Sequence, residues 1–302
     1  MQGSPRIFDR ALLRARRRRA ARMNPADFLL AAVARELAER LAAVTRRFEL
    51  ALDLGCHTGL LADALLATGR VGAVLRTDSS PALLASQPGL RVAADEELLP
   101  FRDGAFDLIA SVLSLHFVND LPGALVQIRR ALRPDGLFLA AMLGHGTLQE
   151  LKEAFAGAEA EITGGASPRI APFAELRDAG ALLQRAGLAL PVADQDLVTV
   201  RYDDAFALMA DLRAMGATNV LVERTRRPLR RAVLLRAAEI YGARFADPDG
   251  RIRASFQVIS LAGWAPHESQ QKPLRPGSAQ ARLADALGVQ ETGLGVKARP
   301  TS

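Results

Sequence analysis

Short apolar segments alternate with helical segments between residues 48 and 145, and no other feature of the chain restricts the fold as strongly. Strands that are apolar along their whole length are buried on both faces, and strands that alternate with helices pair in parallel. We therefore predict an α/β protein whose parallel sheet is covered by helices on both faces. The predicted strands are 48–54, 71–78, a brief strand within 90–101, 106–115 and 137–143.

The segments that flank this sheet are helical before it and mixed after it. Residues 26–44 place apolar side chains at helical spacing, which predicts an amphipathic helix. After the sheet we predict two helices on either side of a polar loop that can fold over a site, and then two strands separated by a helical stretch. These segments are, in order, 147–160, 162–172, 173–187, 188–202, 204–246 and 253–265.

Three parts of the chain are predicted. Residues 1–25 form an arginine-rich helix. Residues 26–265 form one domain, in which the stretch at about 204–246 lacks strand signals and is interpreted as a helical cap on the sheet. Residues 266–302 shift to Pro, Gly, Gln and Ser, which is typical of an extended or disordered tail.

Cysteine, histidine and apolar content exclude several kinds of site. The single cysteine, Cys56, rules out a disulfide within the chain and a zinc site of cysteines, and it indicates a reducing compartment. The four histidines form no helical pair with an acid between them, so no metal site is predicted. No apolar run approaches the roughly 20 residues that span a bilayer, so no transmembrane segment is predicted.

Arginine supplies nearly all of the 39 basic residues, which outnumber the 33 acidic ones and give a net charge of +6. This bias favours an acidic partner or reflects the nucleotide composition of the gene, and both interpretations stay open. Arginines cluster at 14–23 and 224–231. The first cluster resembles a mitochondrial presequence, although Asp9 and the direct continuation into a helix favour a mature N-terminal helix. Neither cluster has interleaved aromatic residues, so no nucleic-acid partner is predicted.

The turn after the first strand, in ALDLGCHTGLL at 51–61, has the strand–turn–helix form that holds nucleotide-type cofactors. Its glycines lack the G-x-G-x-x-G spacing with which a dinucleotide loop holds a pyrophosphate. A carboxylate just before the turn, that of Asp53, repels a pyrophosphate but attracts a sulfonium and an ammonium group. The sequence therefore predicts S-adenosylmethionine as the cofactor. The predicted cofactor residues of this segment are Asp53, Gly55, Cys56, His57 and Gly59.

Polar residues at the ends of three further strands extend this predicted site. Asp78 and Ser79 follow the second strand, where a carboxylate can bind ribose hydroxyls. Asp95 and Glu96 follow the third strand, where they can meet the adenine amine, and Ser111 on the fourth strand is expected to approach the cofactor. The alternative for each acid is a helix N-cap or a solvated loop.

His57 stands where such loops normally carry a second glycine. Histidine tolerates the left-handed backbone region better than most residues, so the turn need not collapse, but the ring fills volume. The ring either points to solvent or caps the next helix, or it touches the methionine end of the cofactor. We expect a cofactor site that is weakened but retained.

Several segments together resemble the class I S-adenosylmethionine-dependent methyltransferases. They are ALDLGCHTGLLADAL, TDSS, ADEELLPFRDGAFDLIAS and RALRPDGLFLAAM. Within that superfamily, IFDRALLRARRRRAARM, SLHFVNDLPGAL, GTLQELKEAF and HESQQKPL are similar to the protein arginine hydroxylases of mitochondrial complex I assembly and their bacterial relatives. The malonyl carrier-protein O-methyltransferases of biotin synthesis are more distantly similar.

This resemblance covers nearly the whole chain and implies a Rossmann-like seven-stranded methyltransferase sheet with an antiparallel last strand. It also implies S-adenosylmethionine in the loop. The implied target is an arginine of the iron–sulfur subunit near the quinone site of NADH dehydrogenase. The family usually has glycine where this chain has His57, which bears on cofactor affinity.

His116 and Asn119 are the predicted catalytic residues, because the fourth strand delivers them to the edge where substrates meet a cofactor. His116 can serve as a base during methyl transfer. The alternative is that Asn119 or Asp120 caps the next helix and that His116 packs under the cap. No residue pattern predicts the metal or second cofactor that carbon hydroxylation usually needs, so only the family likeness supports hydroxylation.

Three hypotheses for function follow. The first is an S-adenosylmethionine-dependent enzyme that modifies a protein side chain, in an NADH dehydrogenase subunit, during complex I assembly. The second is a small-molecule or carrier-protein O-methyltransferase, and the third is a non-catalytic assembly chaperone. The expected location is the bacterial cytoplasm, peripheral to the inner membrane, with the mitochondrial matrix as the alternative. No oligomeric state is predicted.

Overall fold

The computed structural model describes residues 6–23, 25–271 and 288, and it divides the chain into two units, Met1–His267 and Glu268–Ser302. All helices and strands of the described residues belong to the first unit. Most of the predicted tail, 266–302, lies outside the described residues, so the prediction for it stays a prediction. Within the described residues, no helix is both long and apolar enough to cross a membrane.

A mixed sheet forms the centre of the first unit, and its order in the described residues is β3-β2-β1-β4-β5-β7-β6. The first five strands pair in parallel, whereas β7 runs antiparallel to both of its neighbours. The predicted fold class and the antiparallel last strand are confirmed. The strands are β1 (Phe48–Leu54), β2 (Val71–Asp78), β3 (Leu90–Ala93), β4 (Phe106–Val112), β5 (Leu132–Leu143), β6 (Ala189–Tyr202) and β7 (Ile252–Trp264).

The ends of β1, β2, β3 and β4 meet at one edge of the sheet. Leu54 pairs with Thr77, and Asp78 at the end of β2 pairs with Ala93 at the end of β3. The strand order reverses between β1 and β4, and open α/β sheets bind their ligands in the crevice outside the carboxyl ends of the strands at such a point. The predicted site residues at the strand ends therefore lie at the edge where a ligand is expected.

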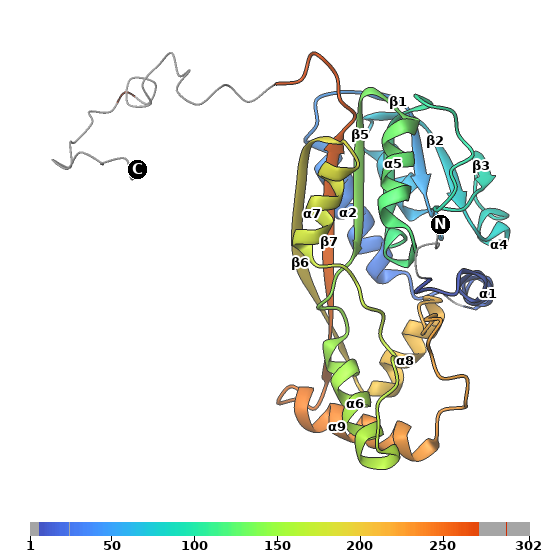
Figure 1. Ribbon diagram of the computed structural model, residues 1–302, viewed down its shortest axis with the longest axis vertical. Helices are drawn as coiled ribbons and strands as arrows, with labels where there is room; N and C mark the ends of the chain where they lie inside the picture. The colour runs from blue at the N-terminus through green and yellow to red at the C-terminus, as the bar shows by residue number, and fades with distance from the viewer. Residues whose placement is uncertain (1–5, 24, 272–287, 289–302) are drawn as a thin grey trace. The chain divides into compact units, whose positions relative to one another are not determined.

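Helices cover both faces of the sheet (Figure 1). On one face, α2 (Phe28–Ala42) and α3 (Leu60–Ala67) contribute to a cluster of buried side chains with alternate residues of β4 and β5. On the other face, α5 (Leu121–Ala131) and α7 (Leu176–Arg185) pack against the intervening residues of the same strands. Successive strand residues point to opposite faces, so strands covered on both sides must be apolar throughout, as β4 is.

The fourth strand ends earlier than predicted. Its pattern extended to residue 115, but β4 ends at Val112, because Leu113 adopts a left-handed backbone with φ 48°. A short 3₁₀ helix, η1 (Leu115–Phe117), follows immediately. This turn aims Ser114 and the residues of η1 across the carboxyl edge of the sheet.

Two helices occupy the stretch predicted as a cap, α8 (Ala205–Ala214) and α9 (Arg231–Phe245), with the non-helical residues 215–230 between them. They share their end of the molecule with α6 (Gln149–Thr163) (Figure 1). An ion pair joins α6 to α9, with 2.6 Å between Arg236 Nε and Glu161 Oε2. The arginine-rich segment between α8 and α9 is mostly exposed.

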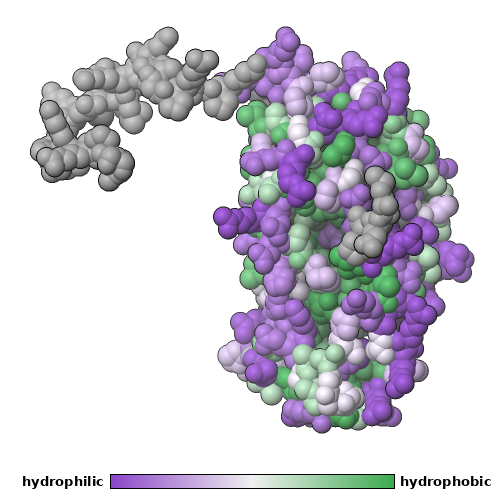
Figure 2. All heavy atoms as spheres, viewed as in Figure 1, coloured by the Kyte–Doolittle hydropathy of each residue, from purple (hydrophilic) through white to green (hydrophobic). Residues whose placement is uncertain are grey.

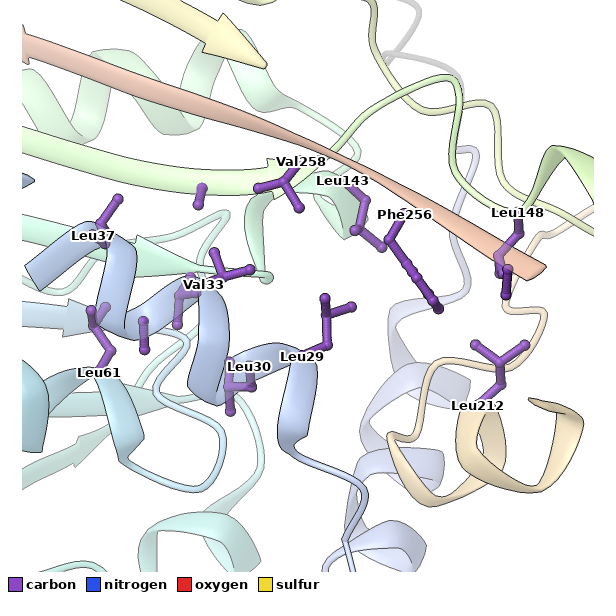
Figure 3. Close-up of a cluster of buried hydrophobic side chains, with 14 of the residues drawn as sticks. Leu29, Leu30, Val33, Leu37, Leu61, Leu143, Leu148, Leu212, Phe256 and Val258 are labelled. Carbon is purple, nitrogen blue, oxygen red and sulfur yellow. The ribbon is translucent and has the colours of Figure 1, made fainter. Parts of the chain in front are cut away.

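The buried cluster on the α2 face continues from the sheet into this helical part. In Figure 3, Leu29, Leu30 and Val33 of α2 lie on one side of Val258 and Phe256 of β7. Beyond Phe256 the cluster reaches Leu148, just before α6, and Leu212 of α8. One apolar core therefore supports both the sheet and the helices at its end.

Candidate functional site

The turn after β1 packs tightly against the end of β4. Gly55 has φ 74°, and a Cβ built on it would lie 2.2 Å from Ser114 Oγ. No residue but glycine fits there, because both the backbone angle and the space exclude a side chain. The turn continues through the buried Cys56 to Gly59, whose φ is 88°. The predicted loop is thus formed, with α3 beginning directly after it.

His57 adopts the left-handed backbone, with φ 49°. Its ring does not cap α3: Nε2 lies 3.1 Å from the carbonyl oxygen of Leu113, so the side chain bridges the turn to the end of β4. Burial and the nearby Arg17 lower the pKa of His57 to about 3. The ring is therefore neutral and, because a carbonyl only accepts, Nε2 carries the proton.

Asp53 and Ser111 lie deeper in the sheet than the turn. Asp53 Oδ2 accepts a hydrogen bond from the Ala62 amide at 3.1 Å, and Oδ1 has no partner. Burial raises the pKa of Asp53 to about 7, so its charge is weaker than we expected from the sequence. Ser111 donates to the Leu54 carbonyl at 2.7 Å. This hydrogen bond links β4 to β1 within the sheet, and the expected approach of Ser111 to the cofactor stays a prediction.

The acids at the ends of β2 and β3 converge near Ser114. Asp78 is fully buried, and its Oδ1 accepts a hydrogen bond from the Ser80 amide at 2.7 Å, while the Ser79 hydroxyl has no partner. Glu96 is also fully buried and accepts a hydrogen bond from Ser114 Oγ at 2.7 Å. Asp95 is about a third exposed. The structure therefore brings Asp78 and Glu96 together with a serine that the sequence did not single out.

Two arginines of α1 (Arg10–Ala20) enter this acid cluster. Arg10 Nη2 lies 2.6 Å from Asp95 Oδ1 and also binds Glu96, and Arg17 Nη1 lies 3.4 Å from Glu96 Oε1. Burial alone would raise the pKa of Glu96, but Arg17 and Arg10 outweigh it and hold that pKa at about 2. Sequence reasoning missed both arginines, although their spacing of seven residues puts them on one face of a helix.

The N-terminal segment is fixed across the carboxyl edge of the sheet. Asn119 Oδ1 accepts hydrogen bonds from the amides of Ile7 and Phe8 at 2.8 and 2.7 Å, and its Nδ2 donates to the Phe8 carbonyl. The Asp9 amide donates to the Val220 carbonyl at 2.8 Å, in the segment after α8. Asn119 therefore holds this segment, and its catalytic role stays a prediction. Asp120 caps α5, as the alternative allowed.

A cavity of about 140 Å³ lies beside the acid cluster. Its wall includes Arg17, His57, Phe117 and the end of α8, together with part of the loop at 162–172 that we expected to fold over a site. The apolar end of the cluster in Figure 3 forms another part of the wall. In Figure 2, apolar residues are visible in the middle of the molecule among more polar ones.

His116 lies in the cavity wall and packs against the rings of Phe117 and Phe173. Its Nδ1 accepts a hydrogen bond from the Leu143 amide at 3.3 Å. Burial lowers the pKa of His116 well below its usual value, so the ring is neutral. With Nδ1 engaged as an acceptor, Nε2 carries the proton. His116 is therefore placed at the site, but as a hydrogen-bond donor, and the expected base role is not supported by this geometry.

Comparison with known proteins identifies the family. A family profile described as a methyltransferase domain matches residues 52–140. The mitochondrial arginine-hydroxylase NDUFAF5 of Rattus norvegicus is 40% identical over 300 residues, covering 96% of this chain and 87% of the relative. The chain belongs to this methyltransferase-fold family. A malonyl-[acyl-carrier protein] O-methyltransferase of Xylella fastidiosa is 35% identical over 223 residues, covering 71% of this chain and 73% of that protein.

The family's fold is also found among solved structures. The YcgJ protein of Bacillus subtilis aligns with a TM-score of 0.53 at 16% identity, covering 77% of this chain and 99% of that protein. The likeness concerns the fold alone. This chain is thus a methyltransferase-fold enzyme, and S-adenosylmethionine is the cofactor that membership of the family implies.

The residues at the carboxyl edge fit S-adenosylmethionine in their chemistry. Acids stand at the ends of β1, β2 and β3, and three buried oxygens there have no hydrogen-bond partner: Asp53 Oδ1, Thr58 Oγ1 and Ser79 Oγ. A cofactor at this edge would share its space with the His57 ring and the Arg17 side chain, because both border the cavity. In the described part of the chain, no group of three or more His, Cys, Asp and Glu residues is placed to hold a metal ion.

Proposed function

We propose that this protein binds S-adenosylmethionine at the carboxyl edge of its sheet and hydroxylates an arginine side chain of an NADH dehydrogenase subunit during complex I assembly. The observation that carries the proposal is the 40% identity to a mitochondrial arginine-hydroxylase over 96% of this chain. The acid cluster supports it, because buried carboxylates next to a cavity suit a cationic side chain.

Hydroxylation replaces one C–H bond of the arginine by a C–OH group. With dioxygen as the oxidant, one oxygen atom enters the arginine and the other leaves as water, and the reaction consumes two electrons from a reductant and two protons. The residues of this protein would bind and orient the arginine and exclude water from it. When bound, S-adenosylmethionine would supply an electrophilic sulfonium methyl group, which serves the methyl transfer considered next and takes no part in this oxygen insertion.

Methyl transfer to a carrier protein or a small molecule is the second candidate. The 35% identity to a malonyl-[acyl-carrier protein] O-methyltransferase favours it, and the cavity wall is largely apolar. That match covers less of this chain, 71% against 96%, so we place it second.

We also propose that the protein works in a bacterial cytoplasm close to the membrane where its partner assembles.

A deletion strain tests both candidates. NADH dehydrogenase subunits from wild-type and deletion strains are compared by peptide mass spectrometry. Loss of one oxygen atom from an arginine peptide, restored by complementation, supports hydroxylation. Loss of a methyl group from a peptide or a carrier protein overturns hydroxylation in favour of methyl transfer. Poor assembly with no mass change overturns both and leaves an assembly chaperone.

A further inference from the structure

A guanidinium group already lies in the acid cluster, and it is that of Arg17. Its Nη1 lies 3.4 Å from Glu96 Oε1, and its Nη2 lies 3.5 Å from Ser114 Oγ. Its Cζ lies 5.9 Å from the centre of the Phe117 ring. A carboxylate, a hydroxyl and an aromatic face are the groups with which proteins recognise a guanidinium.

Arg10 and Arg17 both contact the carboxylate of Glu96, but at different distances. Arg10 Nη2 lies 2.6 Å from Asp95 Oδ1 and still closer to Glu96 Oε2. The contacts of Arg17 are 3.4 Å to Glu96 and 3.9 Å to Asp78, longer than the ~2.7–2.9 Å of a charge-assisted hydrogen bond. Arg10 therefore anchors α1 on Glu96, whereas Arg17 is a looser occupant of the same cluster.

The position of Arg17 at the cavity gives it room to be replaced. Arg17 and Phe117 both line the cavity. The cavity's volume of about 140 Å³ is less than half of the roughly 300 Å³ at the lower end of small-molecule sites. Displacement of this side chain would enlarge the open space where the strand order reverses. Arg10 and Asn119 would still hold the start of the N-terminal segment.

We propose that Glu96, Ser114 and Phe117 form a binding site for a guanidinium group, which Arg17 occupies from within the protein and which an arginine side chain of the protein substrate takes by displacing it. The identity of the incoming arginine rests on the proposed function. The site itself rests on the contacts of Arg17. In the structure as it stands, α1 blocks the site with a copy of the group that the site recognises.

Chemical rescue of Arg17→Ala tests the site. The variant lacks the ethylguanidinium part of the side chain, so its melting temperature should fall and millimolar N-ethylguanidinium should restore most of the loss. Propylammonium, a cation without the planar fork, should restore much less. Arg18→Ala is the matched control, because Arg18 is exposed on the same helix and should show no rescue. Equal effects of the two cations, or of N-ethylguanidinium on both variants, would overturn the proposal.

Arg17→Met keeps the test decisive where Arg17→Ala fails to fold, because it retains an apolar stem. N-acetyl-arginine methylamide should bind Arg17→Met about tenfold more tightly than the wild-type protein, as a freed site requires. Adding Glu96→Gln to that variant should remove the gain. Equal affinity for the wild-type protein and Arg17→Met contradicts internal occupancy.

Both measurements are made without S-adenosylmethionine and without turnover. Failed rescue together with hydroxylated arginine in vivo rejects Arg17 as the internal occupant and leaves the proposed function standing. Successful rescue without any arginine modification in vivo supports Arg17 as the internal occupant and rejects the proposed function.

Discussion

The His57 ring lies 3.1 Å from the carbonyl oxygen of Leu113 and closes the gap between the turn after β1 and the end of β4. The ring is neutral, because burial and Arg17 lower its pKa to about 3. It is held at a backbone angle that glycine adopts without strain. His57 thus links the turn to the end of β4 while it takes space beside the cavity.

His57→Gly should bind S-adenosylmethionine more tightly, by about tenfold, because the ring no longer fills space beside the cavity. Isothermal titration calorimetry with the cofactor and its demethylated product measures the change. His145→Gln is the control, because His145 is an exposed histidine outside the cavity wall and should leave affinity unchanged. Weaker binding by His57→Gly would mean that the ring holds the cofactor.

Asn119 should hold the N-terminal segment in its ordered position on the sheet. Asn119→Leu removes the acceptor for the Ile7 and Phe8 amides and should cost about 1–3 kcal/mol. Asn119→Asp keeps an acceptor for both amides and should cost less. The measurement is amide hydrogen exchange of residues 7–20. Exchange there should be faster in Asn119→Leu than in Asn119→Asp. Slow exchange in Asn119→Leu together with lost activity would support the predicted catalytic role instead.

Glu96 should make stability depend on pH in the acid range. Its pKa in the folded protein, about 2, lies below the value of 4.5 expected when unfolded, so its ionised form favours folding. This contribution is fully present above pH 4.5 and is lost as the pH falls toward 2. The difference in unfolding free energy between wild type and Glu96→Gln should therefore be on the order of 2–3 kcal/mol at pH 7 and should shrink below pH 4.5.

Urea unfolding at pH 7, 5 and 3.5 measures that difference. Glu161→Gln is the matched control, since Glu161 lies on the exposed surface of α6, pairs with Arg236 of α9 and should give a smaller difference. A Glu96→Gln difference that stays constant over this range would show that the carboxylate is not stabilised by Arg10 and Arg17.

The centre of the sheet could be predicted from local pattern because a strand such as β4 is apolar on both faces. The bounds of β1 and β2 agree with the prediction, and β4 ended early only because Leu113 turns the backbone. Asp78 and Glu96 could be placed at the site because parallel strands end at one edge.

The contacts made by distant segments could not be predicted. Arg17 and Glu96 are 79 residues apart in the sequence. Asn119 and Ser114 likewise bind residues far from them in the sequence, Phe8 and Glu96 respectively. A single sequence carries no local signal for such pairs. The hydrogen bonds of Ser111 and Asn119 could not be predicted for this reason, because each side chain binds backbone of another segment.

Titration of the purified wild-type protein with S-adenosylmethionine, with NAD as the competitor of another class, tests the central claim most directly. A ligand that binds only the folded state must raise the melting temperature. We predict that S-adenosylmethionine and its demethylated product raise it and that NAD does not. A protein stabilised by NAD and unaffected by S-adenosylmethionine would contradict that claim.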